Sequence, residues 1–367
     1  MIVFSSLTSE RFTIDFPLEQ TMSRVAPTKM KVLITSYLAP ELVDTIRQRV
    51  PEVELIFRED LLYRPKHATD HTTVPSRTPE QDLEWKTLLA DSDILFDFDH
   101  SHINDLPDLA PKLKWIQATS AGIGQFVRSK GYAEKTDWIF TTASGVHIRP
   151  LAEFAIMSML IFAKDYFRIQ DQQSDKVWQY FTANELRDYT LGIVGFGKIG
   201  REIARLAKSF DMRVVGTRRD PKGHIPNVDE LYPPSDIASV LRQSNFLCLT
   251  APHTDETTNM IGEKELAQLP DGAVLINISR GAIVDESAMI QALRSGKLRG
   301  ASLDVFVNEP LPTNSPLWTM PRVIISPHSA SNGVNENRRL VDLFCENLKR
   351  FTRGEPLLNV LDTRKLY

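Results

Sequence analysis

Short apolar runs alternate along the chain with stretches in which apolar residues recur every three to four positions. The short runs are typical of buried strands, and the periodic stretches, such as 200–210 and 286–296, are typical of amphipathic helices. This alternation predicts an α/β fold with parallel sheets. The strands that we predict lie at 31–36, 54–57, 94–98, 115–119 and 138–142 in a first set, and at 191–197, 212–217, 246–251, 273–279, 301–306 and 323–327 in a second set.

An apolar segment at residues 149–170 joins the two sets, and Pro150 is well placed for the first turn of a helix. Its apolar residues are too many for one exposed face, which favours a helix that crosses between domains or packs against a second subunit. Residues 61–79, rich in proline and threonine, predict a long loop. Residues 1–29 predict an N-terminal extension, since they lack the basic start of a secretory signal and contain acids that transit peptides avoid.

Composition and charge argue against several classes of binding partner. Hydrophobic residues make up 42% of the 367 residues and charged residues 25%, as in an ordinary globular protein. The formal net charge of -4 gives no overall attraction to nucleic acid or anionic membrane, and no run of about 18 apolar residues predicts a membrane span. Cys248 and Cys345 are too few for a disulfide framework and wrongly spaced for a zinc site. We therefore expect a cytoplasmic protein without nucleic-acid or membrane partners.

A glycine motif points to a nucleotide. Gly195, Gly197 and Gly200 form the sequence GFGKIG, directly after a predicted strand and directly before a predicted helix. This spacing allows a tight turn and a close approach of the backbone to a pyrophosphate, whose charge lies at the helix N-terminus. The motif alone is weak, and an ordinary glycine-rich turn is the alternative. Its place between strand and helix predicts a dinucleotide site.

The residues that follow the next strand indicate which dinucleotide. Arg218 and Arg219 stand close to the interval of about 20 residues at which an acid binds the ribose 2′-hydroxyl of NAD. Guanidinium groups match the oxygens of a 2′-phosphate, and Thr217 adds a neutral hydrogen-bonding group. These residues predict a preference for NADP(H), with NAD(H) possible. The open alternative is that both arginines are solvated and that Asp220 accepts from the ribose.

Three later strand ends carry charged side chains, namely Arg280, Glu309 and His328. In open α/β sheets, ligands bind at the carboxyl ends of the strands. An imidazolium at His328 would protonate the oxygen of a carbonyl that receives a hydride, and Glu309 beside it would favour that charged form. Arg280 would hold a substrate carboxylate by two-point binding. Singly, each could be an ion pair or a packed side chain; together they predict reduction of a 2-oxo acid.

The sequences GFGKIG, NISRGAIVDE, LDVFVNEP and SPHSAS resemble those of the D-isomer-specific 2-hydroxyacid dehydrogenase family, and the resemblance extends over residues 31–361. It implies two Rossmann-like domains with the active site in the cleft between them. A discontinuous substrate domain would comprise 30–148 and 328–367, and a dinucleotide-binding domain would comprise 149–327. It also implies a homodimer with the 149–170 helix in its interface.

The resemblance further implies roles for individual residues. It assigns the catalytic roles to Arg280, Glu309 and His328. It assigns the substrate contacts to Ala121 and Gly122, together with Arg280 and His328. Many relatives carry an aspartate where this chain has Gly124, which leaves the rigidity of this loop open. With the residues derived above, the predicted cofactor contacts are Gly195, Gly197, Lys198, Ile199, Gly200, Thr217, Arg218, Arg219, Ile278, Arg280, Asp304 and His328.

The activity implied is reduction of a 2-oxo acid, with glyoxylate and hydroxypyruvate as possible substrates, to a D-2-hydroxy acid. Tyr63 and Trp318 are aromatic candidates for the pocket wall. A rival reading is a cofactor-sensing binding protein, because the family includes corepressors on the same fold. A formate dehydrogenase is a third option, but its relatives generally pair the histidine with an amide, and Glu309 argues against it.

Several other histidines are candidates for functional residues. Residues 97–108 hold two histidines among four acids, and an HxH pair can chelate a metal. Hydride transfer from a nicotinamide needs no metal, so we expect none here or at 67–71. His147 is expected to be structural, although it could line the cleft. His253 is expected in a loop over the cofactor.

Overall fold

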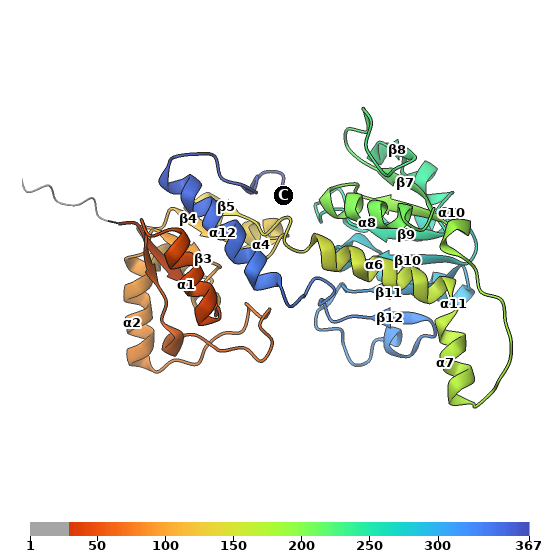
Figure 1. Cartoon of the computed structure of the whole chain (residues 1–367), viewed down its shortest axis with the longest axis horizontal. Helices are drawn as coiled ribbons and strands as arrows, with labels where there is room; N and C mark the ends of the chain where they lie inside the picture. Colours follow the sequence, from red (N-terminus) through yellow and green to blue (C-terminus); the bar gives the residue numbers. More distant parts are fainter. Residues whose placement is uncertain (1–28, 367) are drawn as a thin grey trace, which may run out of the picture.

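The computed structural model describes residues 29–366, which form two lobes, each built around a parallel sheet (Figure 1). The predicted extension at 1–29 therefore lies outside the described residues, apart from Lys29. Within 29–366, no helix combines the length and apolarity needed to cross a membrane. The α/β fold with two parallel sheets that the sequence predicts is confirmed.

The first sheet has the strand order β2-β1-β3-β4-β5, and all its pairs are parallel. Its strands are β1 (Lys31–Ile34), β2 (Glu54–Ile56), β3 (Ile94–Phe96), β4 (Trp115–Gln117) and β5 (Ile139–Thr141). The helices of this lobe are α1 (Pro40–Arg49), α2 (Pro79–Ala90), α3 (Leu106–Leu109), α4 (Gly124–Ser129), α5 (Tyr132–Lys135) and α12 (Glu336–Thr352). The loop predicted at 61–79 contains no helix or strand between the 3₁₀ turn η1 (Glu59–Leu61) and α2.

The second sheet has the order β12-β11-β10-β9-β6-β7-β8. Its strands are β6 (Thr190–Val194), β7 (Arg213–Thr217), β8 (Glu230–Tyr232), β9 (Phe246–Leu249), β10 (Ala273–Asn277), β11 (Leu298–Leu303) and β12 (Val323–Ile325). Its helices are α6 (Ile148–Ala163), α7 (Tyr166–Ser174), α8 (Lys198–Lys208), α9 (Ile237–Leu241), α10 (Glu263–Gln268) and α11 (Glu286–Ser295). The remaining 3₁₀ turns are η2 (His100–His102), η3 (Leu186–Asp188), η4 (Pro234–Asp236), η5 (Gly281–Ile283) and η6 (Pro316–Thr319).

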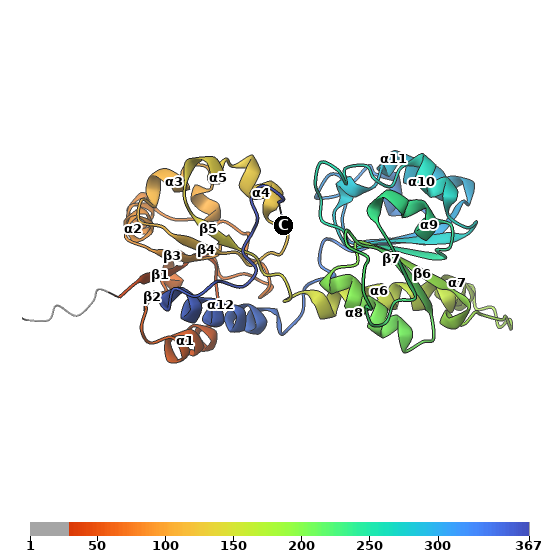
Figure 2. The ribbon, with the colours of Figure 1, turned by 90° about the horizontal axis from the view of Figure 1, so that it is seen from above.

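The chain crosses between the lobes twice. The first crossing leads from β5 into α6, which packs on α8 of the second lobe, and the second leads from β12 into α12, which packs beside α1 of the first lobe (Figure 2). His147 Nε2, at the N-cap of α6, lies 3.2 Å from Glu336 Oε1 at the start of α12; Glu336 is buried and His147 is largely buried. This pair joins the two crossings, so the structure gives His147 the structural contact expected for it.

The linking helix is broken. The prediction of one helix over 149–170 is wrong, because α6 ends at Ala163 and α7 begins at Tyr166. Asp165 between them has a φ of 51°, a left-handed conformation that stops an α-helix. Its carboxylate accepts from Arg299 (3.0 Å) and Arg322 (2.9 Å), which come from distant parts of the chain. These ion pairs stabilise the break between the two helices, which the local sequence does not predict.

Candidate active site

The glycine motif forms the turn between β6 and α8. Gly195 has a φ of 94°, and a Cβ there would lie 2.5 Å from the backbone of Ala251, so only glycine fits this close approach. At Gly197 the situation is the reverse: an added Cβ would meet nothing closer than 3.9 Å. The first position packs the turn against β9, and the second leaves open space directly above the backbone.

The open space is bordered by hydrogen-bond donors at the start of α8. The first helical bond runs from Arg201 N–H to Gly197 O (3.0 Å). The N–H groups of Lys198, Ile199 and Gly200 precede it and have no partner among residues 29–366. A run of unpaired N–H groups at a helix N-terminus binds phosphate, since the helix dipole favours negative charge there. The residues present fit the pyrophosphate of a dinucleotide.

The residues after β7 lie at the edge of the second sheet where the ribose of a dinucleotide would bind. Thr217 is buried, and its hydroxyl accepts from Gly195 N–H (3.1 Å), so it holds the glycine turn. Arg218 is partly exposed, and its own N–H donates to Tyr232 O of β8 (2.9 Å). Arg219 and Asp220 are exposed, and Asp220 accepts from Lys222 N–H (3.3 Å). One oxygen of the alternative ribose acceptor is therefore engaged in its own loop.

The predicted acid–base pair is formed. Glu309 Oε2 lies 2.7 Å from His328 Nδ1, and Glu309 Oε1 accepts from Phe306 N–H (3.0 Å). Burial raises the pKa of Glu309, but the hydrogen bonds from His328 and Phe306 and the nearby charge of Arg280 outweigh it, so the pKa lies below its usual value. Because Nδ1 is held by the carboxylate, Nε2 is the ring nitrogen left to face a substrate.

The backbone at His328 is fixed in an uncommon conformation. Its φ is 53°, and its N–H points at Asp304 O (2.9 Å) and Ser326 O (3.0 Å). Asp304 is buried just beyond β11, and one oxygen accepts from Ser326 Oγ (2.6 Å) and from the N–H of Ser329 and Ala330 (2.8 Å each). Burial raises the pKa of Asp304 despite these bonds. Asp304 thus organises the turn that presents the imidazole.

Arg280 reaches from the second lobe to the first. It follows β10, and its guanidinium donates to Ser279 O (2.7 Å, Nη1) and to Gly122 O (3.2 Å, Nη2). A Cβ on Gly122 would lie 2.1 Å from Arg280 Nη2, so glycine is needed for this approach. Burial lowers the pKa of Arg280, while the charges of Glu309 and Asp304 oppose that effect. Ile278, also predicted at the cofactor, is buried just before Arg280.

The loop after β4 presents free donors beside this guanidinium. Ala121 and Gly122 are exposed, and their N–H groups have no partner within the described part of the chain. Gly124, which the resemblance marks as a departure from the family pattern, starts α4, and a Cβ there would lie 2.0 Å from Leu366 O. The departure therefore has a packing reason: the C-terminal segment lies against this glycine. Asp97 also holds the loop, accepting from Thr119 Oγ1 (3.0 Å) and Thr119 N–H (3.3 Å).

Two further contacts join the lobes around the site, and sequence reasoning missed both. Lys198 Nζ donates to Asn359 Oδ1 (3.1 Å) and Ser144 Oγ (3.3 Å) of the first lobe. Arg128 of α4 forms a two-point ion pair with Asp255, in the loop after β9, at 2.9 and 3.1 Å. Lys198 belongs to the glycine motif, but nothing in that motif indicates a partner on the other lobe, and no motif includes Arg128 or Asp255.

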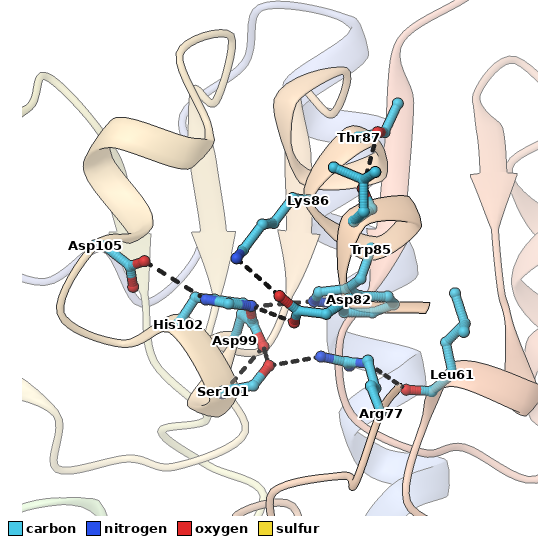
Figure 3. A network of polar contacts seen from close by, with 11 residues as sticks. Leu61, Arg77, Asp82, Trp85, Lys86, Thr87, Asp99, Ser101, His102 and Asp105 are labelled. Atoms are coloured by element: carbon cyan, nitrogen blue, oxygen red, sulfur yellow. Dashed lines mark hydrogen bonds and ion pairs between the residues drawn. The ribbon is translucent and has the colours of Figure 1, made fainter. Parts of the chain in front are cut away.

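The histidine-rich segment at 97–108 has a structural explanation (Figure 3). Asp99 accepts from Trp85 Nε1 (3.1 Å) and from Ser101, and His102 lies between Asp82 (2.8 Å) and Asp105 (3.5 Å). Arg77 stacks on Trp85 and donates to Leu61 O and Ser101 Oγ in the same network. Among residues 29–366, no three histidine, cysteine or acidic side chains are grouped for a metal ion. These polar groups mostly bond to one another, although Arg77 Nη2 is buried without a hydrogen-bond partner.

The remaining candidate residues, His253, Trp318 and Tyr63, lie in loops or in a short 3₁₀ turn. His253 Nε2 is 2.9 Å from Thr258 Oγ1 in the loop after β9. Trp318 is half exposed on η6, with its Nε1 donating to Pro312 O (3.0 Å). Tyr63 is exposed to a similar extent and lines a pocket of the first lobe.

Comparison with known proteins agrees with this arrangement. The family described as "D-isomer specific 2-hydroxyacid dehydrogenase, NAD binding domain" matches residues 156–330. A glyoxylate reductase of Thermofilum pendens is 33% identical over 261 residues, which are 68% of this chain and 75% of the relative. The chain belongs to the D-isomer-specific 2-hydroxyacid dehydrogenase family. It is therefore an NAD(P)-dependent oxidoreductase that reduces a 2-oxo acid by hydride transfer.

Solved structures of the family show the same two-lobed fold. A D-isomer-specific 2-hydroxyacid dehydrogenase from Xanthobacter autotrophicus, in complex with NADPH and MES, is 26% identical with a TM-score of 0.75, covering 93% of this chain and 100% of that one. An NADPH-dependent glyoxylate/hydroxypyruvate reductase from Sinorhizobium meliloti, in complex with NADP and sulfate, is 25% identical with a TM-score of 0.75, covering 92% and 100%.

Proposed function

We propose that the protein is an NADPH-preferring reductase that converts a small 2-oxo acid to a D-2-hydroxy acid, with Arg280 binding the carboxylate and His328 donating the proton. The observation that carries this proposal is the convergence of the Glu309–His328 pair, the Arg280 guanidinium and the free N–H groups of Ala121 and Gly122 at the facing edges of the two lobes. Glyoxylate and hydroxypyruvate are the substrates to test first, since relatives are named for them.

The chemistry follows from the donors present. A nicotinamide cofactor held at the glycine motif would supply a hydride to the carbonyl carbon. The substrate carboxylate accepts from the N–H groups of Ala121 and Gly122 and from the guanidinium of Arg280, whose charge also polarises the ketone. His328 Nε2–H donates its proton to the carbonyl oxygen as negative charge develops there. Glu309 accepts from Nδ1–H and stabilises the imidazolium that makes this donation possible.

The cofactor preference rests on the loop after β7. We propose that Arg218 and Arg219 bind the 2′-phosphate of NADPH, while the N–H groups of Lys198, Ile199 and Gly200 bind the pyrophosphate. Asp304 and Ile278 would lie near the nicotinamide. The experiment is direct: kcat/KM is measured for NADPH and for NADH with glyoxylate and hydroxypyruvate. A higher value for NADPH is expected, and equal or higher values for NADH would refute the preference.

The division of the chain and its assembly belong to the same proposal. We propose a substrate domain at 30–148 and 328–367, a dinucleotide-binding domain at 149–327, a cytoplasmic location and a homodimer. Support for the dimer comes from the segment after α7, where Trp178 and Tyr180 are each 89% exposed, and from Met157 on α6 and Ile169 on α7, each 41% exposed. Large apolar side chains that remain this exposed are typical of an interface. Sedimentation at micromolar concentration tests this: a monomer would refute it.

A further inference from the structure

The side chain of Lys198 leaves the glycine motif and crosses to the first lobe. Lys198 is the first residue of α8, and its ammonium donates to Asn359 Oδ1 (3.1 Å) and to Ser144 Oγ (3.3 Å). Ser144 lies in the loop after β5, and Asn359 lies in the segment after α12. A lysine ammonium has three N–H donors, and the third has no partner among residues 29–366.

The charge of this ammonium is not neutralised by the protein. Both of its partners are uncharged groups, and within the described part of the chain no carboxylate forms an ion pair with Lys198. The free N–H groups at the start of α8, which fit a pyrophosphate, begin at Lys198 itself. The third N–H of the ammonium is therefore available to a phosphate oxygen while the other two remain on the first lobe.

The acceptors on the first lobe are held in place. Asn359 has a φ of 56°, a left-handed conformation that asparagine tolerates. Its Nδ2 donates to Ser144 O (2.7 Å), so Oδ1 is the amide atom that faces Lys198. Its carbonyl oxygen accepts from Thr142 N–H (2.9 Å). Asn359 and the loop after β5 thus form one unit that presents two oxygens to the ammonium.

The loop after β5 also positions the substrate loop. Ala143 N–H donates to Ser120 O (3.0 Å), and Ser120 directly precedes Ala121, whose own N–H is free. Only this hydrogen bond and short backbone segments separate Ser144 from the N–H of Ala121. Arg280, on the other side of the cleft, belongs to the same lobe as Lys198. A shift of Ser144 relative to the second lobe therefore changes the distance between the two groups that would share the substrate carboxylate.

We propose that Lys198 and Asn359 are positioning residues, through which the dinucleotide-binding turn holds the substrate loop in register with Arg280. The inference rests on the proposed function, because it takes the carboxylate of the oxo acid to bind between that loop and Arg280. Neither side chain is among the groups assigned to the oxo acid. Their loss should therefore raise KM for the oxo acid without removing any group that binds it.

A different role for Lys198 predicts a different result. If its ammonium serves only to bind the pyrophosphate, its removal weakens the binding of NADPH, and KM for the oxo acid at saturating NADPH is unchanged. Asn359 would then have no part in the reaction, because it lies on the opposite lobe from the glycine motif. Asn359 is therefore the residue that separates positioning from cofactor binding.

The test uses Asn359→Ala, Lys198→Met and the double variant, with the exposed lysine of α10 changed in Lys264→Met as the matched control. The Kd of NADPH is measured by fluorescence titration without oxo acid, and KM and kcat for glyoxylate are measured at saturating NADPH. In Asn359→Ala we expect KM to rise about three- to ten-fold, as the loss of one hydrogen bond provides, while Kd stays within about two-fold of the wild type. Lys198→Met should raise KM at least as much and should also raise Kd.

The double variant tests whether the two residues act through one contact. Its KM should match that of Lys198→Met, because the hydrogen bond to Asn359 is already lost in that variant, whereas independent effects would multiply. Lys264→Met should keep the wild-type KM and Kd.

The remaining outcomes separate this inference from the proposed function. A wild-type KM in folded Asn359→Ala, or KM effects that multiply in the double variant, would overturn the positioning role and leave the proposed function standing. If the melting temperature shows that Asn359→Ala is unfolded, Lys198→Met decides, since its side chain is exposed: an unchanged KM at saturating NADPH overturns the role. If the wild type reduces neither glyoxylate nor hydroxypyruvate, the proposed function is refuted, and the inference that rests on it falls too.

Discussion

Glu309 Oε2 lies 2.7 Å from His328 Nδ1, and the same carboxylate is fixed by Phe306 N–H. Glu309 has a pKa below its usual value, so it carries its charge throughout the neutral range. The imidazole is thereby held in one orientation beside a permanent negative charge, and that charge favours the protonated ring that a reductase needs.

Replacing Glu309 by Gln keeps the shape and removes the charge. The protonated form of His328 then loses its negatively charged partner, so we expect the basic limb of the pH profile of 2-oxo acid reduction to move toward lower pH. The measurement is kcat/KM against pH for the wild type, Glu309→Gln and the exposed control Glu263→Gln. Overlaying profiles for the wild type and Glu309→Gln would contradict the role assigned to this carboxylate.

Arg280→Lys keeps a cation but removes two-point binding. Because the guanidinium approaches Gly122 O while facing the substrate loop, we expect a higher KM for the oxo acid, a lower kcat and a fall in kcat/KM of roughly 10- to 150-fold. Burial also lowers the pKa of a lysine, so the loss should grow as pH rises. Arg294→Lys on the surface of α11 is the control. Normal kinetics in a folded Arg280→Lys protein would place Arg280 outside the site.

The fold could be read from the sequence because strands buried on both faces are continuous apolar runs, and all eleven predicted strands are present. The short edge strand β8 was missed: Glu230, Leu231 and Tyr232 are only partly buried and show no such run. The break at Asp165 was missed because the arginines that hold it are distant in sequence.

The predicted site residues share a simple property: each lies at or beyond the carboxyl end of a strand of a parallel sheet, where side chains of successive strands meet. The residues that were missed lack it. Arg128 and Asp255 are far apart in the sequence, and their ion pair exists only because α4 of the first lobe lies beside the loop after β9 of the second. No spacing rule connects them, so three-dimensional packing was needed to find them.

The ion pair between Arg128 and Asp255 should act on closure of the cleft. Its two contacts join the lobes, but both side chains are largely exposed, so its effect is modest and screened by salt. We expect Arg128→Ala to raise KM for the oxo acid about three-fold at low ionic strength and less at high ionic strength. The exchange Arg128→Asp with Asp255→Arg should restore the wild-type value. Failure of the exchange to restore KM would show that the effect does not come from the ion pair.

Substitutions in the loop after β7 should change the preference between NADPH and NADH. Arg218 and Arg219 would make charge-assisted bonds to a 2′-phosphate, and losing one such bond costs about 1.5–3 kcal/mol, or roughly 10- to 150-fold in affinity for NADPH. In the variant Arg218→Asp with Arg219→Ala, the new carboxylate would repel the phosphate and accept from the free 2′-hydroxyl of NADH. We therefore expect the ratio of kcat/KM for the two cofactors to invert while the preference among oxo acids is unchanged.

The control for this variant is Arg213→Ala, which removes a surface arginine from the same strand without facing the ribose position; Arg213 pairs with Glu230 at the other end of β7. It should keep the wild-type preference. The competing arrangement, with Asp220 as the ribose acceptor, requires a wild type that already prefers NADH and a double variant that hardly differs from it. The carboxylate of Asp220 is engaged by Lys222 N–H, which argues against that arrangement, and the two cofactor ratios decide between them.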